Sequence, residues 1–401
     1  MSARATPLRE RSGVRPEIQA LRAIAVLAVV IGHVWPRFAP GGFVGVDVFF
    51  VISGFLITGQ LIRERERTGT IALRSFYLRR ARRLLPAAIV VLAVCAVLTL
   101  VFVPRGLWEQ YLGEIVASLL YVQNWFLAIA SLDPTRAVLD ASPVVHFWSL
   151  SVEEQFYLVW PLLIILCYAA IGVLGRRGPR IAPVFGVVLG AVTIASFVYC
   201  VLQTGVSASD VAYYSTFARA WEFGLGGLLA FLPLAHSFLT PRQRGVISWL
   251  GVAAIVGAVL AWRDPGAFPG PLAVVPALGA AAVIIAGAPE LSWGTIRIAR
   301  LRFVQWLGDA SYSLYLWHWP IIAFLPFITG VPTPWYVLIG VLALCLVVAG
   351  LSLRFIENPI RFRTPGFVRA RTAILGGLVA LAAGTVGASA WGIWAAAAEF
   401  G

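Results

Sequence analysis

LRAIAVLAVVIGHVW, residues 21–35, is a run of apolar side chains interrupted by one arginine and one histidine. With its neighbours it reaches the ~20-residue length of a membrane-spanning helix. Similar runs recur along the whole chain, because 60% of the 401 residues are hydrophobic and only 12% are charged. A soluble domain carries about 25% charged residues. The sequence therefore predicts an all-α fold, a polytopic membrane helix bundle.

The apolar runs predict eleven membrane-spanning helices. A cytoplasmic tail over 1–17 precedes a membrane domain over 18–363 that holds ten of them. A linker and the eleventh helix occupy 364–401. The predicted spans are 18–36, 43–62, 84–103, 147–172, 181–202, 211–234, 245–262, 271–288, 303–325, 333–355 and 372–396.

The charged residues indicate how these helices are oriented. All 31 basic residues are arginines, and the formal net charge is +13. With the N-terminus in the cytoplasm, 25 arginines fall on cytoplasmic loops and helix ends and four fall outside. The positive-inside rule favours this arrangement, which places the C-terminus outside the cytoplasm. Topology therefore explains the basic charge, and no nucleic-acid partner is expected.

Residues 104–146 decide the orientation of every later helix. They contain WEQYLGEIVASLLYVQNWFLAIA, which is long enough to cross a membrane. A span here would invert the later loops and move Arg176, Arg177 and Arg180 to the outer side. We therefore expect an amphipathic or re-entrant segment on the outer face.

Arg22 and His33 are the sharpest polar pair inside a predicted span. Eleven helical steps bring them within ~20° of one face, about 16 Å apart along the axis. Ionisable groups inside a membrane are costly and mark functional sites, and histidine takes and returns protons near neutral pH. The alternative is a histidine that only links two helices by hydrogen bonds.

Paired arginines occupy the cytoplasmic end of the third span, in FYLRRARRLLP. Arg80 and Arg83 share a helix face, and so do Arg79 and Arg82. Guanidinium groups suit phosphates in bidentate geometry. Arginines at this position also satisfy topology alone, so the pattern by itself does not establish a site.

Two adjacent carboxylates, Glu153 and Glu154, begin the fourth span in HFWSLSVEEQFYLVWP, with Tyr157 close by. Neighbouring helical positions point about 100° apart, so only one of the two can face a given site. A metal site is conceivable, but no matching cluster of ligands supports one, and we expect neither a metal nor a bound cofactor.

Further polar residues interrupt other spans. Arg219 and Glu222 are three positions apart and either form a structural ion pair or line a cavity. Ser311 and His318 fall on one helical stripe with Tyr315, which indicates a polar cavity or hydrogen bonds between helices. Ser53 is a polar residue of the second span.

Seven motifs in order resemble the membrane-bound acyltransferase-3 family, and together they cover roughly residues 15–363. They are LRAIAVLAVVIGHVW, GVDVFFVISGFLIT, SFYLRRARRLLPA, WSLSVEEQFYLVWP, RAWEFGLGGLLA, SYSLYLWHWP and RFIENPIR. Members of that family move acyl groups, often acetyl, from cytoplasmic acyl-CoA to hydroxyls of cell-envelope glycans, lipopolysaccharide sugars, peptidoglycan or macrolide sugars.

The resemblance implies roles for individual residues. The family's arginine–histidine pattern matches Arg22 and His33, with His33 as the essential catalytic histidine. Its donor-binding arginine pair matches Arg80 and Arg83, although Arg79 and Arg82 fit the same spacing. Its glutamate matches Glu153. The serine–tyrosine pair of its SYSLYLWH motif matches Ser311 and Tyr312.

The resemblance also implies a location and a further domain. We expect a multi-pass protein of the inner (plasma) membrane. Many relatives continue after an eleventh span into an extracytoplasmic SGNH hydrolase-like domain that completes transfer to the acceptor. This chain ends at Gly401, so we expect it to be the membrane domain of a longer protein, with such a domain as a partner.

Combining both arguments predicts a mechanism. Acyl-CoA enters from the cytoplasm, and its thioester reaches a cavity lined by the first four spans and the ninth. His33 deprotonates the acceptor hydroxyl or carries the acyl group, Arg22 binds the donor or orients the site, and Glu153 orients His33 or fixes the acceptor. The rival hypothesis is a secondary transporter or lipid flippase, although neither internal repeats nor discontinuous helices support it. A receptor or scaffold leaves the buried polar residues unexplained.

Overall fold

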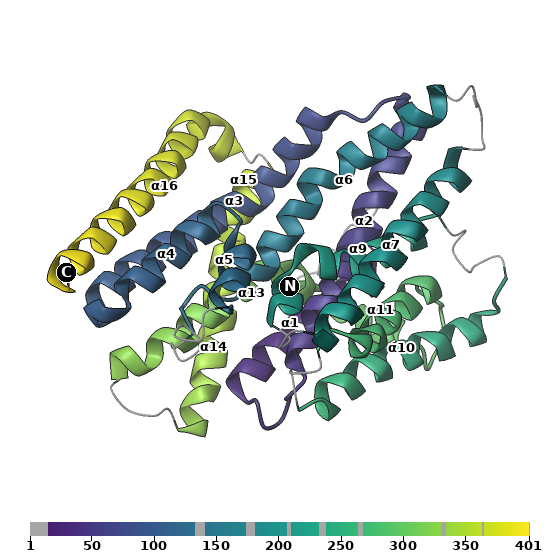
Figure 1. Ribbon diagram of the computed structural model, residues 1–401. Coiled ribbons are helices and arrows are strands. Elements are labelled where there is room, and N and C mark those ends of the chain that lie inside the picture. Colours follow the sequence, from purple (N-terminus) through teal and green to yellow (C-terminus); the bar gives the residue numbers. More distant parts are fainter. Residues whose placement is uncertain are drawn as a thin grey trace, which may run out of the picture.

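Every regular element in the described part of the chain is helical (Figure 1). The computed structural model describes residues 15–132, 141–173, 181–206, 210–231, 238–263, 268–329, 334–362 and 365–400. The longer helices are α1 (Pro16–Val34), α2 (Gly45–Thr68), α3 (Leu73–Phe102), α4 (Trp108–Leu119), α5 (Gln123–Ala130), α6 (Phe147–Val173), α7 (Ile181–Val206), α9 (Thr216–Leu229), α10 (Pro241–Ala261), α11 (Val274–Ala286), α13 (Arg302–Thr329), α14 (Trp335–Ser352) and α16 (Pro365–Phe400).

Eight helices of the described residues are long and apolar enough to cross a membrane, which makes the chain a multi-pass membrane protein. They are α1, α2, α3, α6, α7, α10, α14 and α16. Each of the other three predicted spans also contains a helix. Two of these are short, with 14 residues in α9 and 13 in α11. The third, α13, is 28 residues long but is not among the eight. The predicted count of eleven therefore depends on α9, α11 and α13.

The segment expected on the outer face is broken into two helices instead of forming one long one. α4 has 12 residues and α5 has 8. Between them Tyr121 adopts a positive φ of 54°, a conformation that interrupts a right-handed helix. Neither helix reaches the length that a membrane crossing needs.

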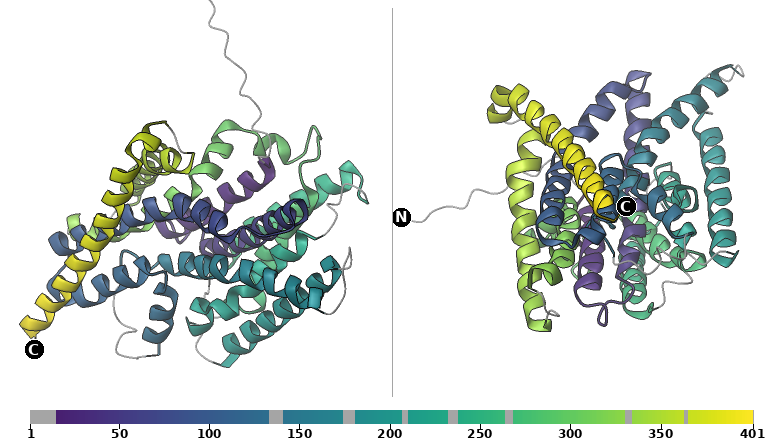
Figure 2. Two further views of the ribbon diagram at one scale, coloured as in Figure 1. Left: turned by 90° about the horizontal axis from the view of Figure 1, so that it is seen from above. Right: turned by 60° about the vertical axis from the view of Figure 1, so that its left-hand side comes forward.

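α1 and α2 lie at the centre of the bundle. α1 packs along α13 and α2, and α2 packs along α9. In the most apolar stretch of α2, 83% of the residues are buried, against 11% in α16. Figures 1 and 2 show α16 lying along α3 and α4 at one edge, with the α10–α11 hairpin on the opposite side.

Glycines allow α2 and α9 to approach closely. A Cβ atom on Gly54 would lie 2.0 Å from the Phe223 carbonyl oxygen, and one on Gly226 would lie 2.0 Å from the Val51 carbonyl oxygen. Small residues permit such backbone contact between membrane helices. The contact fixes the position of Ser53, the neighbour of Gly54 on α2.

Candidate functional site

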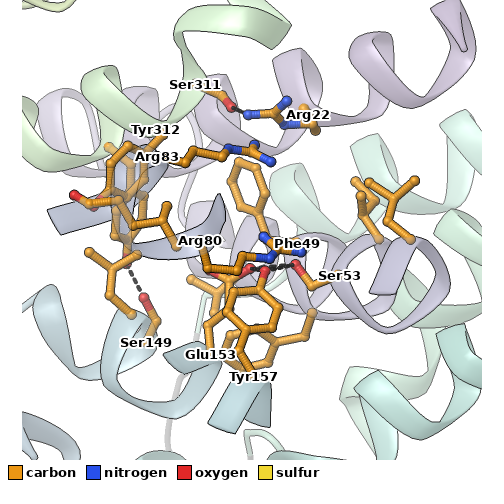
Figure 3. Close-up of a pocket in the computed structure, with 17 residues that line it drawn as sticks. Arg22, Phe49, Ser53, Arg80, Arg83, Ser149, Glu153, Tyr157, Ser311 and Tyr312 are labelled. Carbon is orange, nitrogen blue, oxygen red and sulfur yellow. Dashed lines mark hydrogen bonds between the residues drawn. The ribbon is translucent and has the colours of Figure 1, made fainter. Parts of the chain in front are cut away.

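A cavity lies between α1, α2, α3, α6 and α13 (Figure 3). These five helices contain the first four predicted spans and the ninth, the same segments that the sequence predicted to line the cavity. Polar side chains from all five reach it: Arg22, Ser53, Arg80, Arg83, Ser149, Glu153, Tyr157, Ser311, Tyr312 and Tyr315.

The geometry of α3 resolves which pair of arginines faces this cavity. Arg80 and Arg83 line it. Arg79 instead donates to Ser75 Oγ at 3.0 Å and to Glu64 Oε2 at 3.5 Å. Arg82 lines a separate apolar groove between α3 and α16. Both pairs have the spacing that shares a face, and the packing of α3 selects the first.

Three guanidinium groups, from Arg22, Arg80 and Arg83, therefore converge on one cavity. The Arg22 Nη2 donates to Ser311 Oγ at 2.8 Å, and its Nη1 donates to Gln19 Oε1 at 3.1 Å. Figure 3 shows the Arg83 side chain extending toward Arg22. Within the described residues Arg83 has no ion pair. Glu153 is the single carboxylate among the lining residues, so the cavity carries net positive charge.

Glu153 is held by two hydroxyl groups across the cavity. Its Oε1 accepts hydrogen bonds from the hydroxyls of Ser53 and Tyr157. The Tyr157 hydroxyl also lies 3.0 Å from Ser53 Oγ. The ring of the same tyrosine lies 4.0 Å below the Arg80 Cζ, which is a cation–π contact. This cluster fixes one carboxylate beside the arginines.

Tyr315 lines the cavity and connects it to the histidines. Its hydroxyl lies 2.6 Å from Ser149 Oγ and 3.1 Å from the His146 carbonyl oxygen. Its ring packs against the rings of His146 and His318, with centroids 5.5 Å apart in each case. Tyr312, which also lines the cavity, donates to the Leu84 carbonyl at 2.8 Å.

His33 does not line this cavity. It lies near the other end of α1, where its Nδ1 is 3.0 Å from His318 Nε2. The imidazole is exposed and packs against Trp319, with ring centroids 4.8 Å apart. Glu153, which we expected either to orient His33 or to fix the acceptor, accepts hydrogen bonds from Ser53 and Tyr157 at the cavity.

The cavity and the histidines are linked by two facing stripes. Arg22 and His33 lie on one face of α1, and they meet Ser311 and His318 on α13. The predicted stripe of α13 thus contacts the cavity at one end and His33 at the other. His146 and Trp319 have no predicted role in the sequence, because aromatic residues near a span end are typical of any membrane helix.

Arg219 and Glu222 do not line the cavity either. Arg219 is fully buried and pairs with Asp47 Oδ1 at 3.1 Å and with Glu222 Oε1 at 3.3 Å. The Phe50 ring lies 5.6 Å from its Cζ and the Phe268 ring 5.4 Å. Of the two interpretations of this pair, the geometry corresponds to a structural ion cluster between α2 and α9.

Comparison with known proteins identifies the family. Residues 15–354 match the family described as an acyltransferase domain. The peptidoglycan O-acetyltransferase OatA of Listeria monocytogenes is 33% identical over 356 residues, which cover 86% of this chain and 56% of that protein. YrhL of Bacillus subtilis, provisionally named a peptidoglycan O-acetyltransferase, is 32% identical over 363 residues, or 88% of this chain and 55% of that protein.

The chain thus spans little more than half the length of these relatives. No solved structure is significantly similar to it. The family match covers the cavity, the paired stripes of α1 and α13, and most of the helices around them. The chain therefore belongs to this acyltransferase family, and residues 15–354 are its acyltransferase domain.

Proposed function

We propose that this chain is a membrane O-acyltransferase that uses acyl-CoA, with acetyl-CoA the foremost candidate, as its donor. The observation that carries the proposal is the pairing of α1 and α13. It connects a cavity with three arginines to an exposed histidine about three helical turns away along α1. Such a pair of sites suits a donor with an anionic head and a reactive end on a long arm.

The arginines are proposed to hold the phosphates of the donor. Arg80 and Arg83 act as the main contacts, and Arg22 binds from the opposite wall. Guanidinium groups present several donors in a planar fork that matches phosphate oxygens. Arg83 lines the cavity and forms no ion pair within the described residues, so its guanidinium is the one proposed to make the strongest contact with a phosphate.

His33 is proposed to carry the chemistry through its Nε2. In one route Nε2 takes the proton of the acceptor hydroxyl while that oxygen attacks the thioester carbon; the carbon–sulfur bond breaks, and the proton passes to the CoA thiolate. In the other, Nε2 attacks the thioester carbon, the carbon–sulfur bond breaks, and the CoA thiolate leaves an acyl-imidazole on His33. The acceptor oxygen then attacks the acyl carbon, the carbon–nitrogen bond breaks, and the hydroxyl proton passes to the thiolate. Tyr315 lines the cavity and packs against His318, the partner of His33, so the arm of the donor is proposed to pass this side chain on its way to His33.

We propose eleven spans with the N-terminus in the cytoplasm and the C-terminus outside, in the inner (plasma) membrane. The distribution of 25 inner and four outer arginines supports this orientation. It places the donor cavity on the cytoplasmic half of α1 and His33 on the outer half. α1 thereby spans the path from a cytoplasmic donor to an external acceptor.

The relatives named above point to the class of acceptor. We propose a hydroxyl of a cell-envelope glycan, with peptidoglycan first because the Listeria relative is named for it. The acyl group is delivered directly or passed to an extracytoplasmic SGNH-type domain. Lipopolysaccharide and other sugars remain acceptors for the same chemistry.

Acyl exchange by purified protein tests the proposal. The wild-type chain in lipid nanodiscs, incubated with radiolabelled acetyl-CoA and unlabelled CoA, is expected to exchange or hydrolyse the thioester. His33→Ala and His33→Gln are both expected to abolish this activity while still binding CoA, because glutamine keeps a hydrogen-bonding group but cannot titrate. Arg63→Ala, an exposed change on α2, serves as the control. An active His33→Gln protein contradicts the catalytic role, and transport of a solute without thioester chemistry favours a transporter.

A further inference from the structure

His318 is a fully buried histidine with a hydrogen-bond partner at each ring nitrogen. Its Nδ1 lies 2.7 Å from the carbonyl oxygen of Tyr315, one turn earlier on α13. Its Nε2 lies 3.0 Å from the Nδ1 of His33. The two contacts together determine where the protons are.

A carbonyl oxygen can only accept a hydrogen bond, so the His318 Nδ1 carries a proton. No carboxylate of the described residues forms an ion pair with His318, and an unpaired charge is costly in a dry interior. The ring is therefore neutral, and its Nε2 is an unprotonated acceptor. The Nδ1 of His33 must then be the donor in the contact between the two rings.

This arrangement leaves His33 with its lone pair on Nε2. In a neutral imidazole only one nitrogen carries a proton, and the hydrogen bond at one nitrogen fixes the state of the other. His33 is exposed, and its Nε2 has no hydrogen-bond partner among the described residues. The unprotonated nitrogen is thus the one that an acceptor hydroxyl or a thioester can reach.

The neighbouring groups do not compete for this contact. The Nε2 of His146 donates to the Leu316 carbonyl at 3.2 Å, and its ring packs edge-on against His318 with centroids 5.5 Å apart, without a hydrogen bond to either histidine among the described residues. Trp319 packs against His33 and is anchored by its own Nε1, which donates to the Ser142 carbonyl at 2.8 Å. The orientation of His33 is therefore restrained on one side by a ring contact and on the other by His318.

We propose that His318 is a positioning residue that holds His33 in the tautomer with Nδ1 protonated and Nε2 free to react. The proposal rests on the proposed function of His33 for its chemical consequence, but the tautomer itself is a separate, measurable property. A free neutral histidine in water carries its proton mainly on Nε2. Without His318, the reactive nitrogen of His33 would be blocked for most of the time.

Nitrogen NMR of the full chain tests the tautomer directly. The sequence has four histidines, so ¹⁵N-histidine labelling gives few signals, which single His→Gln variants assign. In the wild type the His33 Nε2 is expected to show the shift of an unprotonated nitrogen. In His318→Met, which fills similar space and offers only a weakly accepting sulfur, that nitrogen is expected to become protonated. In His318→Gln the amide oxygen can accept from His33 Nδ1, so the wild-type tautomer is expected to persist.

Acyl exchange provides the second readout. His318→Met is expected to lose about 10- to 100-fold in exchange rate, the usual cost of removing a partner that orients a functional histidine. His318→Gln is expected to recover most of the rate, and acetyl-CoA affinity should stay unchanged in both. If His318→Met fails to fold, the His33 tautomer in the wild type and in His318→Gln still tests the proposal.

Two results would overturn the proposal. One is a wild-type His33 protonated at Nε2, and the other is an unchanged His33 tautomer in folded His318→Met. A different result separates it from the proposed function. If His33 has the expected tautomer but His33→Gln still exchanges acyl groups, the assignment of His318 stands and the catalytic role of His33 falls.

Discussion

Arg83 is the cavity residue whose charge has the clearest consequence for donor binding. It lines the cavity and lacks an ion-pair partner in the described part of the chain. Arg83→Ala is expected to weaken acyl-CoA binding by about 1–3 kcal/mol, roughly five- to 150-fold, because a charge-assisted hydrogen bond is lost. Lysine should restore only part of the affinity, since it keeps the charge without the fork. Calorimetric titration with CoA measures both.

Arg63 supplies the control for this measurement. It lies on α2, outside the cavity, and its side chain is exposed. Arg63→Ala is expected to leave affinity within a factor of two. Equal losses at Arg63 and Arg83 would show that general positive charge, rather than a defined site, retains the donor.

Arg219 leads to a prediction about stability instead. It is enclosed with Asp47 and Glu222, and all three side chains are fully buried. Arg219→Met is expected to cost about 3–5 kcal/mol and lower the melting temperature, because two carboxyl groups lose their partner. Adding Asp47→Asn and Glu222→Gln should recover much of that loss. Thermal unfolding in detergent compares the variants, and a single substitution without effect would contradict the structural role.

The site residues that could be predicted are those whose polar side chains interrupt an otherwise apolar helix. Arg22, Ser53, Glu153 and Ser311 were singled out in this way, and all four line the cavity. The sequence could not show which arginine pair of α3 faces the cavity, because Arg80 and Arg83 are three residues apart and so are Arg79 and Arg82. Nor could it reveal that the partner of Arg219 is Asp47, since the two are 172 positions apart.

At the scale of elements, the contact between α2 and α9 is the one most sensitive to a single atom. Gly226→Ala would place a methyl group against the Val51 carbonyl. We expect a loss of about 1–3 kcal/mol or more, since backbone cannot yield as a flexible side chain does. Gly190→Ala on α7 meets open space and is the matched control. The yield of monodisperse protein and its melting temperature measure the effect; equal behaviour of the two variants would show that this contact is looser than described.

The membrane-spanning helices could be predicted from the length of the apolar runs in the sequence. Each predicted span contains a helix, because a run of about 20 apolar residues in a membrane has to satisfy its own backbone. The prediction that 104–146 does not cross the membrane rested on the charge of later loops rather than on local sequence, and the division of this segment into two helices was not predicted. The positive φ of Tyr121, just after α4, could not be predicted from the sequence, because tyrosine rarely adopts that conformation.

For the whole molecule, the count and orientation of the spans remain predictions with a direct test. Single cysteines at Phe38 and Arg242, both exposed, are introduced after the four native cysteines are replaced. The eleven-span arrangement predicts that an impermeant reagent added outside labels position 38 and not position 242. Labelling of both from outside would mean that the number of crossings between them is even, as a span within 104–146 or the loss of α9 would make it.

The fixed separation of Arg22 and His33 on one helix makes α1 a molecular ruler. Eleven residues set about 16 Å between the anchor for the donor's phosphates and the reacting nitrogen. A side-chain substitution cannot change that length, because it belongs to the backbone. The spacing then serves only a donor whose phosphates are anchored: acetyl-pantetheine, which keeps the thioester and its arm but lacks the nucleotide phosphates, should react far more slowly than acetyl-CoA at equal concentration. Comparable rates for the two thioesters would mean that the phosphate anchor, and with it the spacing along α1, plays no part in choosing the donor.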